Sequence, residues 1–144
     1  MMFIDSSALS AILVSDPIAP NLVSRLQGAR RKPLTSAITR TEVVTDLAQR
    51  RAAQGDRLMT GDDITLATEA YDELLRLLEC SEIMVTTKIA NVAIEALGQF
   101  SSLSGHRAQL THSDCIIYAS AKTSSMPLLY VPQEGRGYGE TDLA

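Results

Sequence analysis

Short apolar runs alternate along the chain with longer segments in which apolar residues recur every three or four positions. The short runs cover residues 2–4, 32–38, 82–86 and 127–131, and their length and flanking turn residues predict four β-strands. The longer segments are typical of amphipathic helices with one buried face. These predicted helices cover residues 7–15, 19–29, 39–53, 61–79, 87–103 and 111–125.

Each pair of successive strands is separated by two helices in this prediction. Strands joined by helical crossovers form a parallel sheet with helices on both faces, so the expected fold is α/β with three layers. In such sheets, ligands bind beyond the carboxyl ends of the strands. Polar residues that follow a strand are therefore the first candidates for a functional site.

Acidic residues occupy several of these positions. Asp5 follows the first predicted strand, and Glu42 lies in the first turn of the helix after the second strand. Asp114 lies in the first turn of the helix before the last strand, and Glu134 comes just after that strand. These carboxylates are expected to meet at one edge of the sheet, where hard oxygen ligands select Mg²⁺ or Mn²⁺.

Each acidic residue also has a purely structural interpretation. Asp5 can be a helix N-cap, Thr39 to Glu42 matches a capping box, and Asp114 can complement a helix dipole. Capping explains acids at helix starts, but it does not explain why they share one edge of the sheet. The common edge favours the functional interpretation.

Composition limits the other possibilities. The chain has 144 residues, the size of one domain, and we expect a single domain over residues 1–144 with a loop-rich tail from about 131. The net charge of −4 gives no global attraction for nucleic acid, so an RNA would need bridging cations or a local basic patch. The absence of a secretory signal or long apolar run, together with two cysteines and no disulfide pattern, favours the cytoplasm.

Three segments resemble motifs of the PIN-domain family, in the version found in VapC-type toxins. "FIDSSAL" is similar to the opening motif, and "TSAITRTEVV" resembles the second acidic motif. "GHRAQLTHSDCIIYASAKTSSMPLLY" is close to the third, in which an Asp-Cys pair opens a helix carrying Tyr-Ala-x-Ala-Lys. The resemblance extends over nearly the whole chain, and its third motif is the most specific.

The resemblance implies a PIN-like α/β/α fold with a central parallel sheet of four or five strands. It implies a Mg²⁺- or Mn²⁺-dependent endoribonuclease, the toxin of a type II toxin–antitoxin pair, with a cognate antitoxin and operator DNA bound only through that antitoxin. A homodimer is also expected. Asp5, Glu42 and Asp114 carry over as the catalytic acids and metal ligands.

The chain departs from the family pattern at two places. Ser113 stands where a glycine usually precedes the third acid. After the last strand the family has an acidic-aromatic pair and then Thr-Asp, which is interrupted here within "VPQEGRGYGETD". Counting forward from Asp114 assigns Glu134 as a fourth catalytic acid, whereas counting back from Thr141-Asp142 assigns Gly137. We place an insertion in the glycine-rich stretch and predict Glu134.

Substrate phosphates require polar and basic partners. We expect Arg31, Lys32 and Arg40 to bind flanking phosphates and Ser6 to contact the metal-bound water, although the basic run can equally be a solvated surface. Two alternatives stay open: a catalytically weak PIN-like protein that acts through its antitoxin and DNA complex, and a receiver-like phosphoacceptor domain. A receiver-like domain would have two adjacent acids after the first strand, but in this chain Ser6 follows Asp5.

Overall fold

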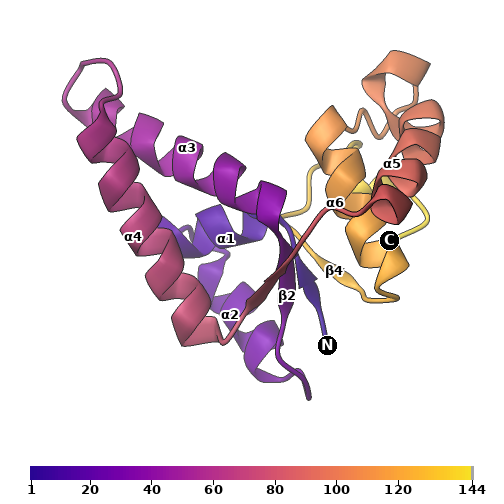
Figure 1. Cartoon of the computed structure of the whole chain (residues 1–144), viewed down its shortest axis with the longest axis horizontal. Helices are drawn as coiled ribbons and strands as arrows, with labels where there is room; N and C mark the ends of the chain where they lie inside the picture. The colour runs from indigo at the N-terminus through magenta and orange to yellow at the C-terminus, as the bar shows by residue number, and fades with distance from the viewer. Residues whose placement is uncertain (144) are drawn as a thin grey trace.

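A central sheet of four parallel strands organises the protein, which we describe from a computed structural model over residues 1–143 (Figure 1). The strands are β1 (Phe3–Ile4), β2 (Leu34–Ser36), β3 (Ser81–Ile83) and β4 (Leu128–Leu129), in the spatial order β3-β2-β1-β4. All neighbouring strands pair in parallel. The predicted element order and the parallel sheet are therefore confirmed.

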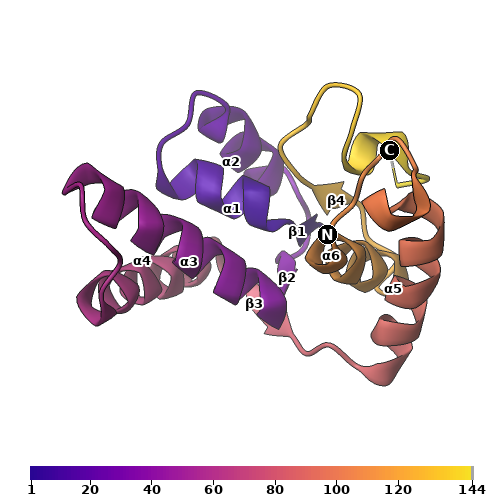
Figure 2. The same ribbon diagram turned by 90° about the horizontal axis from the view of Figure 1, so that it is seen from above.

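The helices form a layer on each face of the sheet (Figure 2). One apolar core joins β1 to α1–α4, and the other joins β1 to α5 and α6, with Ile4 in the first core and Phe3 in the second. Side chains of successive strand residues point to opposite faces, so one two-residue strand supplies both cores. The helices are α1 (Ser6–Leu13), α2 (Ala19–Gln27), α3 (Ala37–Gln54), α4 (Gly61–Leu78), α5 (Thr87–Phe100) and α6 (His112–Thr123).

Helix α3 begins two residues earlier than the sequence indicated. Its N-cap is Ser36, whose side chain accepts from the Ile38 amide. Glu42 therefore lies in the second turn, and the predicted Thr39–Glu42 capping box does not form; the hydroxyl of Thr39 is buried without a partner among residues 1–143. The structural interpretation of Glu42 is wrong.

The predicted strands and the fifth helix are shorter in the structure. Only Leu128–Leu129 of residues 127–131 pair with β1, because β1 itself offers only Phe3 and Ile4. Helix α5 ends at Phe100, where Ser101 adopts an extended conformation and caps a short 3₁₀-helix, η1 (Ser102–Ser104). Such shifts of a few residues leave the edges of the sheet where they were expected.

The C-terminal segment, residues 133–143, is folded onto the domain rather than forming a loose tail. It contains a second 3₁₀-helix, η2 (Tyr138–Glu140), and the Gly137 amide donates to the Ala108 carbonyl at 2.8 Å. Tyr138 is buried in the α5–α6 core. Within the described chain, none of the helices is both long enough and apolar enough to cross a membrane.

Candidate active site

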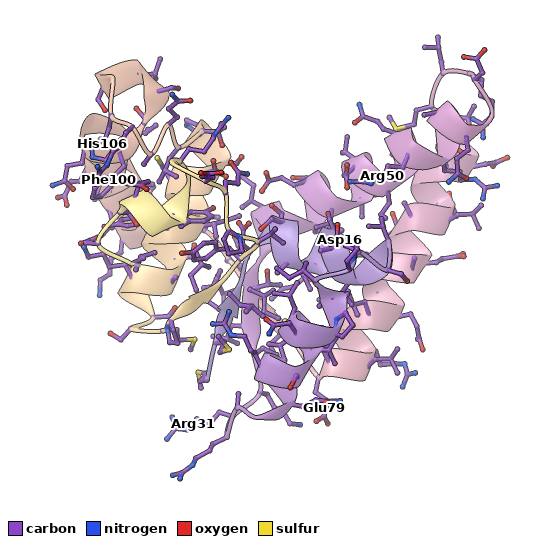
Figure 3. All side chains as sticks on the ribbon, turned by 180° about the vertical axis from the view of Figure 1, so that it is seen from behind. Asp16, Arg31, Arg50, Glu79, Phe100 and His106 are labelled. Atoms are coloured by element: carbon purple, nitrogen blue, oxygen red, sulfur yellow. The ribbon has the colours of Figure 1, made fainter. Side chains whose placement is uncertain are left out.

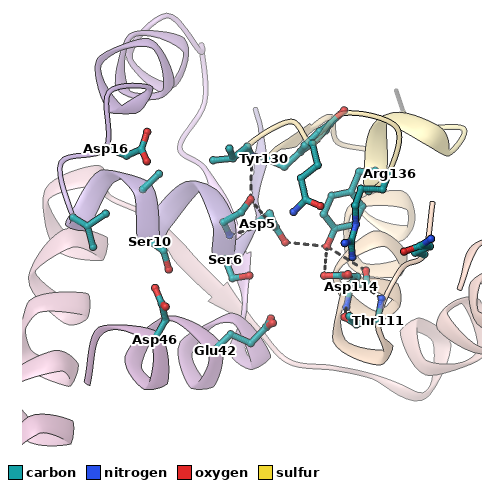
Figure 4. Close-up of a pocket in the computed structure, with 18 of the residues that line it drawn as sticks. Asp5, Ser6, Ser10, Asp16, Glu42, Asp46, Thr111, Asp114, Tyr130 and Arg136 are labelled. Atoms are coloured by element: carbon teal, nitrogen blue, oxygen red, sulfur yellow. Dashed lines mark hydrogen bonds between the residues drawn. The ribbon is translucent and has the colours of Figure 1, made fainter. Parts of the chain in front are cut away.

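A cavity of about 500 Å³ opens at the carboxyl edge of the sheet, beside the ends of β1 and β4 (Figure 4). The chain runs from β1 outward through β2 and β3, and β4 then returns to the other side of β1. Loops diverge at such a reversal and leave a crevice. Asp5, Glu42 and Asp114 all line the cavity, although they belong to three different elements.

Asp5 follows β1 directly and is 3% exposed. One carboxylate oxygen, Oδ2, caps α1 by accepting from the amide and the hydroxyl of Ser7. The other oxygen, Oδ1, turns toward the cavity and accepts from the Tyr138 hydroxyl at 2.9 Å. Burial raises the pKa of Asp5 and Asp114 adds to the rise, while the hydrogen bonds from Ser7 and Tyr138 oppose it.

Asp114 divides its two oxygens in the same way. Its Oδ2 accepts from the Thr111 amide at 2.9 Å, and the Thr111 hydroxyl accepts from the Asp114 amide, which completes a capping box at the start of α6. Its Oδ1 lies 3.3 Å from the Tyr138 hydroxyl. Capping thus uses one oxygen of each aspartate and leaves the other directed at the site.

Glu42 reaches the cavity from α3. Its Oε2 accepts from the Ser113 hydroxyl at 3.1 Å, and its Oε1 is buried without a hydrogen-bond partner among residues 1–143. Burial, together with the charges of Asp5 and Asp114, raises the pKa of Glu42 to about 7. Ser113, which replaces the usual glycine of the family pattern, therefore binds the second acid of the cluster.

Tyr138 is the principal site residue that the sequence analysis missed. Its hydroxyl lies between Asp5 and Asp114, and its ring packs 5.3 Å from that of Tyr130. Burial and the neighbouring charges of Asp5 and Asp114 raise the pKa of Tyr138 well above its ordinary value, so the phenol is neutral. Counting back from Thr141-Asp142 placed this residue at the aromatic position of the family pattern, which was the available signal.

The donor set fits a hard divalent cation. It consists of three carboxylates and the hydroxyls of Ser6 and Tyr138, all of them oxygens. The orphaned Oε1 of Glu42 and its raised pKa are what a cation would relieve. Within residues 1–143, no three carboxylate, imidazole or thiol groups are yet close enough together to hold one metal ion, so binding would draw the three acids closer.

The structure does not bring the predicted basic residues to this cavity. Arg40 lies over the Tyr71 ring and forms ion pairs with Asp72 and Glu82. Arg31 and Lys32 precede β2, at the amino edge of the sheet; Figure 3 shows Arg31 at the far end of the molecule from Arg50. Arg31, Lys32 and Arg40 therefore do not line the cavity, and their predicted contact with RNA phosphates stays a prediction.

Two other arginines line the cavity instead. Arg50 comes from α3 and is paired with Asp46 at 3.0 Å. Arg136 extends from the C-terminal segment on the side of the cavity that carries Asp114 (Figure 4), and it forms no ion pair with any residue of the described range. An arginine that has no carboxylate partner can bind a phosphate group of a substrate in this cavity.

The remaining predicted residues divide between the cavity and the solvent. Ser6 lines the cavity at the start of α1. Glu134 lies in an exposed turn between Gln133 and Arg136 and is not among the residues that line the cavity. Gly137 does line it, so the backward count from Thr141-Asp142 matches the structure better than the forward count.

Comparison with known proteins identifies sequence relatives along the whole chain. The chain is 33% identical to a VapC ribonuclease of Rhizobium meliloti strain 1021 over 144 residues, which cover 99% of each protein. It is 30% identical to Ribonuclease VapC28 of Mycobacterium tuberculosis strain H37Rv over 141 residues, 97% of this chain and 93% of that one.

Solved structures show the same fold at lower identity. The Mycobacterium tuberculosis toxin VapC20, described as cleaving the sarcin-ricin loop, superposes with a TM-score of 0.64 at 17% identity and covers 93% of this chain and 92% of its own. A toxin–antitoxin complex from Klebsiella pneumoniae gives a TM-score of 0.59 at 16% identity, covering 94% and 89%. The family model for the PIN domain matches residues 2–131. With its fold, its acidic cavity and these relatives, the chain belongs to the PIN domain family.

Proposed function

We propose that the chain is a metal-dependent endoribonuclease, the toxin of a type II toxin–antitoxin pair. The observation that carries this proposal is the meeting of Asp5, Glu42 and Asp114 in one cavity at the carboxyl edge of the sheet. The relatives named as VapC ribonucleases support the same reaction class. Membership of the PIN domain family argues against the alternative of a receiver-like phosphoacceptor domain.

Asp5 and Asp114 would hold Mg²⁺ or Mn²⁺ through the oxygens that capping leaves free, and Glu42 would do so through its unpaired Oε1. A divalent cation here would acidify an attacking water and offset the charge of the scissile phosphate. Arg136 and Arg50 replace Arg31, Lys32 and Arg40 as the residues proposed to bind RNA phosphates, because they line the cavity. Ser6, which also lines the cavity, would contact the metal-bound water.

Cleavage of RNA by purified variants tests this function. Asp114→Asn and Glu42→Gln should lose at least about 100-fold in cleavage rate, because each removes one charge that binds the cation and leaves an amide of the same shape. Arg40→Gln, away from the cavity, should retain activity. The proposal would be wrong if both acidic variants still cleaved RNA, or if the wild type showed no cation-dependent cleavage. Either result would favour the alternative of a catalytically weak binding protein.

We also propose an antitoxin that inhibits through the same cavity. A basic side chain of the partner, best an Arg, would pair with the acidic cluster and exclude the cation, since a guanidinium bonds carboxylates in two-point geometry. The toxin–antitoxin complex among the structural neighbours agrees with a partner of this kind. An antitoxin that abolishes cleavage while Mn²⁺ still binds the complex with full affinity would contradict this mechanism.

The same proposal includes the oligomeric state of the protein and its relation to operator DNA. The protein would act in the cytoplasm as a homodimer, and operator DNA would be bound by the antitoxin rather than by this acidic chain. Sedimentation of the purified toxin, alone and with its antitoxin, tests the dimer.

A further inference from the structure

The position that the family pattern reserves for a fourth acid carries no side chain in this protein. Counting back from Thr141-Asp142 places that position at Gly137, whose backbone has φ 80° and ψ −163°. This conformation is essentially restricted to glycine, so an aspartate could not occupy it without a rearrangement of the loop. The glycine instead allows the backbone turn that leads into Tyr138.

The turn at Gly137 determines where Tyr138 lies. The Gly137 amide is held by the Ala108 carbonyl at 2.8 Å, and the next residue enters the core with 5% of its surface exposed. Its hydroxyl lies 2.9 Å from Oδ1 of Asp5 and 3.3 Å from Oδ1 of Asp114. These are the two oxygens that helix capping leaves free.

The contacts of Tyr138 indicate a positioning role. Two carboxylates that face one another repel, and a hydroxyl between them offers a hydrogen bond in place of that repulsion. The single phenol proton is donated to Oδ1 of Asp5, the nearer oxygen, and the phenol oxygen separates it from Oδ1 of Asp114. Both carboxylate oxygens keep a lone pair for a cation. Hydrogen bonds from groups behind metal ligands are known to set ligand direction and to change metal affinity by 10- to 100-fold.

We infer that Tyr138 is a positioning residue of the site: its hydroxyl orients Asp5 and separates it from Asp114 for a divalent cation. This inference rests on the proposed metal site and assigns one of its residues. It also replaces Glu134, which lies in an exposed turn outside the cavity. The C-terminal segment beyond Val131, where the family match ends, thus becomes part of the site.

Direct measurement of Mn²⁺ affinity by calorimetry tests the inference on the full chain, without RNA. Tyr138→Phe removes only the hydroxyl, and we expect Mn²⁺ to bind 10- to 100-fold more weakly. The matched control is Tyr71→Phe, a buried tyrosine in the α1–α4 core whose hydroxyl has no hydrogen-bond partner within the described chain. Its Mn²⁺ affinity should equal that of the wild type.

Other outcomes distinguish a failure of the proposed metal site from a failure of the role assigned to Tyr138. If Tyr138→Phe binds Mn²⁺ as tightly as the wild type, or more tightly because the phenol competes with the cation, the role of Tyr138 is wrong although the metal site stands. If the wild type binds no better than Asp114→Asn, both the site and the inference fail. A purely structural role would lower the melting temperature in chelator and leave Mn²⁺ affinity unchanged.

A second variant keeps the test decisive if Tyr138→Phe does not fold. Gly137→Ala retains the phenol but is incompatible with the backbone at that position, so the hydroxyl must move. We expect it also to bind Mn²⁺ at least about 10-fold more weakly, the scale known for groups behind metal ligands. Wild-type affinity in Gly137→Ala would overturn the inference.

Discussion

At the scale of single residues, helix capping and a place in the acidic cavity are combined rather than exclusive. Asp5 caps α1 with Oδ2, Asp114 caps α6 with Oδ2, and both direct Oδ1 to the cavity. A carboxylate has two oxygens with about four acceptor positions, so one group can serve both roles. Glu42 has no capping role: its Oε2 accepts from Ser113, and its Oε1 is buried without a partner among residues 1–143.

The raised pKa of Glu42 predicts how the stability of the metal-free protein depends on pH. Its pKa is about 7 in the folded state against a reference value of 4.5, so between these values the folded state binds more protons than the unfolded state. Stability should therefore fall as pH rises from about 4.5 to about 7, by clearly less than the roughly 3 kcal/mol of a fully buried group, because Glu42 is partly exposed and solvent screens its charge. Urea unfolding in chelator between pH 5 and pH 8 measures this change.

Glu42→Gln is the control for this pH dependence. The variant should be more stable than the wild type at pH 8 and should show a smaller loss of stability across the same range, since Gln has no charge to bury. Asp5, whose pKa is also raised, accounts for the dependence that remains. If the stability of the two proteins depended on pH in the same way, the pKa of Glu42 would not be raised by its burial in the folded state.

At the scale of elements, the α3–α4 hairpin depends on one buried carboxylate. Asp63 accepts from Arg51, from both terminal nitrogens of Arg57, and from the amide and hydroxyl of Thr60. These bonds close the capping box of α4 and tie the connecting loop to the end of α3. Because α3 carries Glu42 and Arg50, the hairpin supports the site from outside the cavity.

Asp63→Asn should lower the melting temperature at pH 7 without changing Mn²⁺ affinity. The Arg57 guanidinium holds the pKa of Asp63 well below its ordinary value, so its stabilisation is present at neutral pH and is lost as pH falls below about 4. The difference between the variant and the wild type should thus shrink in acid. Asp62→Asn, an exposed neighbour, is the control. A difference that persists unchanged at pH 3 would contradict the role of the charge.

At the scale of the whole molecule, the C-terminal segment joins the two ends of the chain at the cavity. Asp142 pairs with Lys122 at 2.6 Å and accepts from the Tyr118 hydroxyl, and Glu140 pairs with Arg107 at 2.8 Å. These contacts hold the segment against α6 and the loop before it. Together with the hydrogen bond from Gly137 to Ala108 and the burial of Tyr138, this attachment keeps the phenol facing Asp5, which is far away in the sequence.

Asp142→Asn combined with Glu140→Gln should loosen the segment. Both ion pairs are partly exposed, so we expect each to contribute less than about 1 kcal/mol and the loss of Mn²⁺ affinity to be a few-fold, smaller than for Tyr138→Phe. Glu134→Gln, in the same segment, should bind Mn²⁺ as the wild type does. A greater loss in Glu134→Gln than in Tyr138→Phe would restore Glu134 as the fourth acid.

Local features of the sequence were sufficient for the elements, their order and the three acids of the cluster. Helical periodicity and short apolar runs reflect burial on one face or two, and a parallel sheet then directs every strand end to a common edge. Asp5 and Asp114 could be located from these rules because Asp5 follows β1 directly and Asp114 lies in the first turn of α6; Glu42 lies one turn further into α3 but still faces the same edge.

The tertiary structure alone decided which other residues complete the cavity. Arg40 looked available beside Glu42, but its guanidinium pairs with Asp72 and Glu82, residues far along the chain. Tyr138 looked like part of a flexible tail, but the backbone of Gly137 and its contact with Ala108 direct it into the acidic cluster. Neither outcome follows from local patterning, because both depend on contacts between segments that only the folded chain brings together.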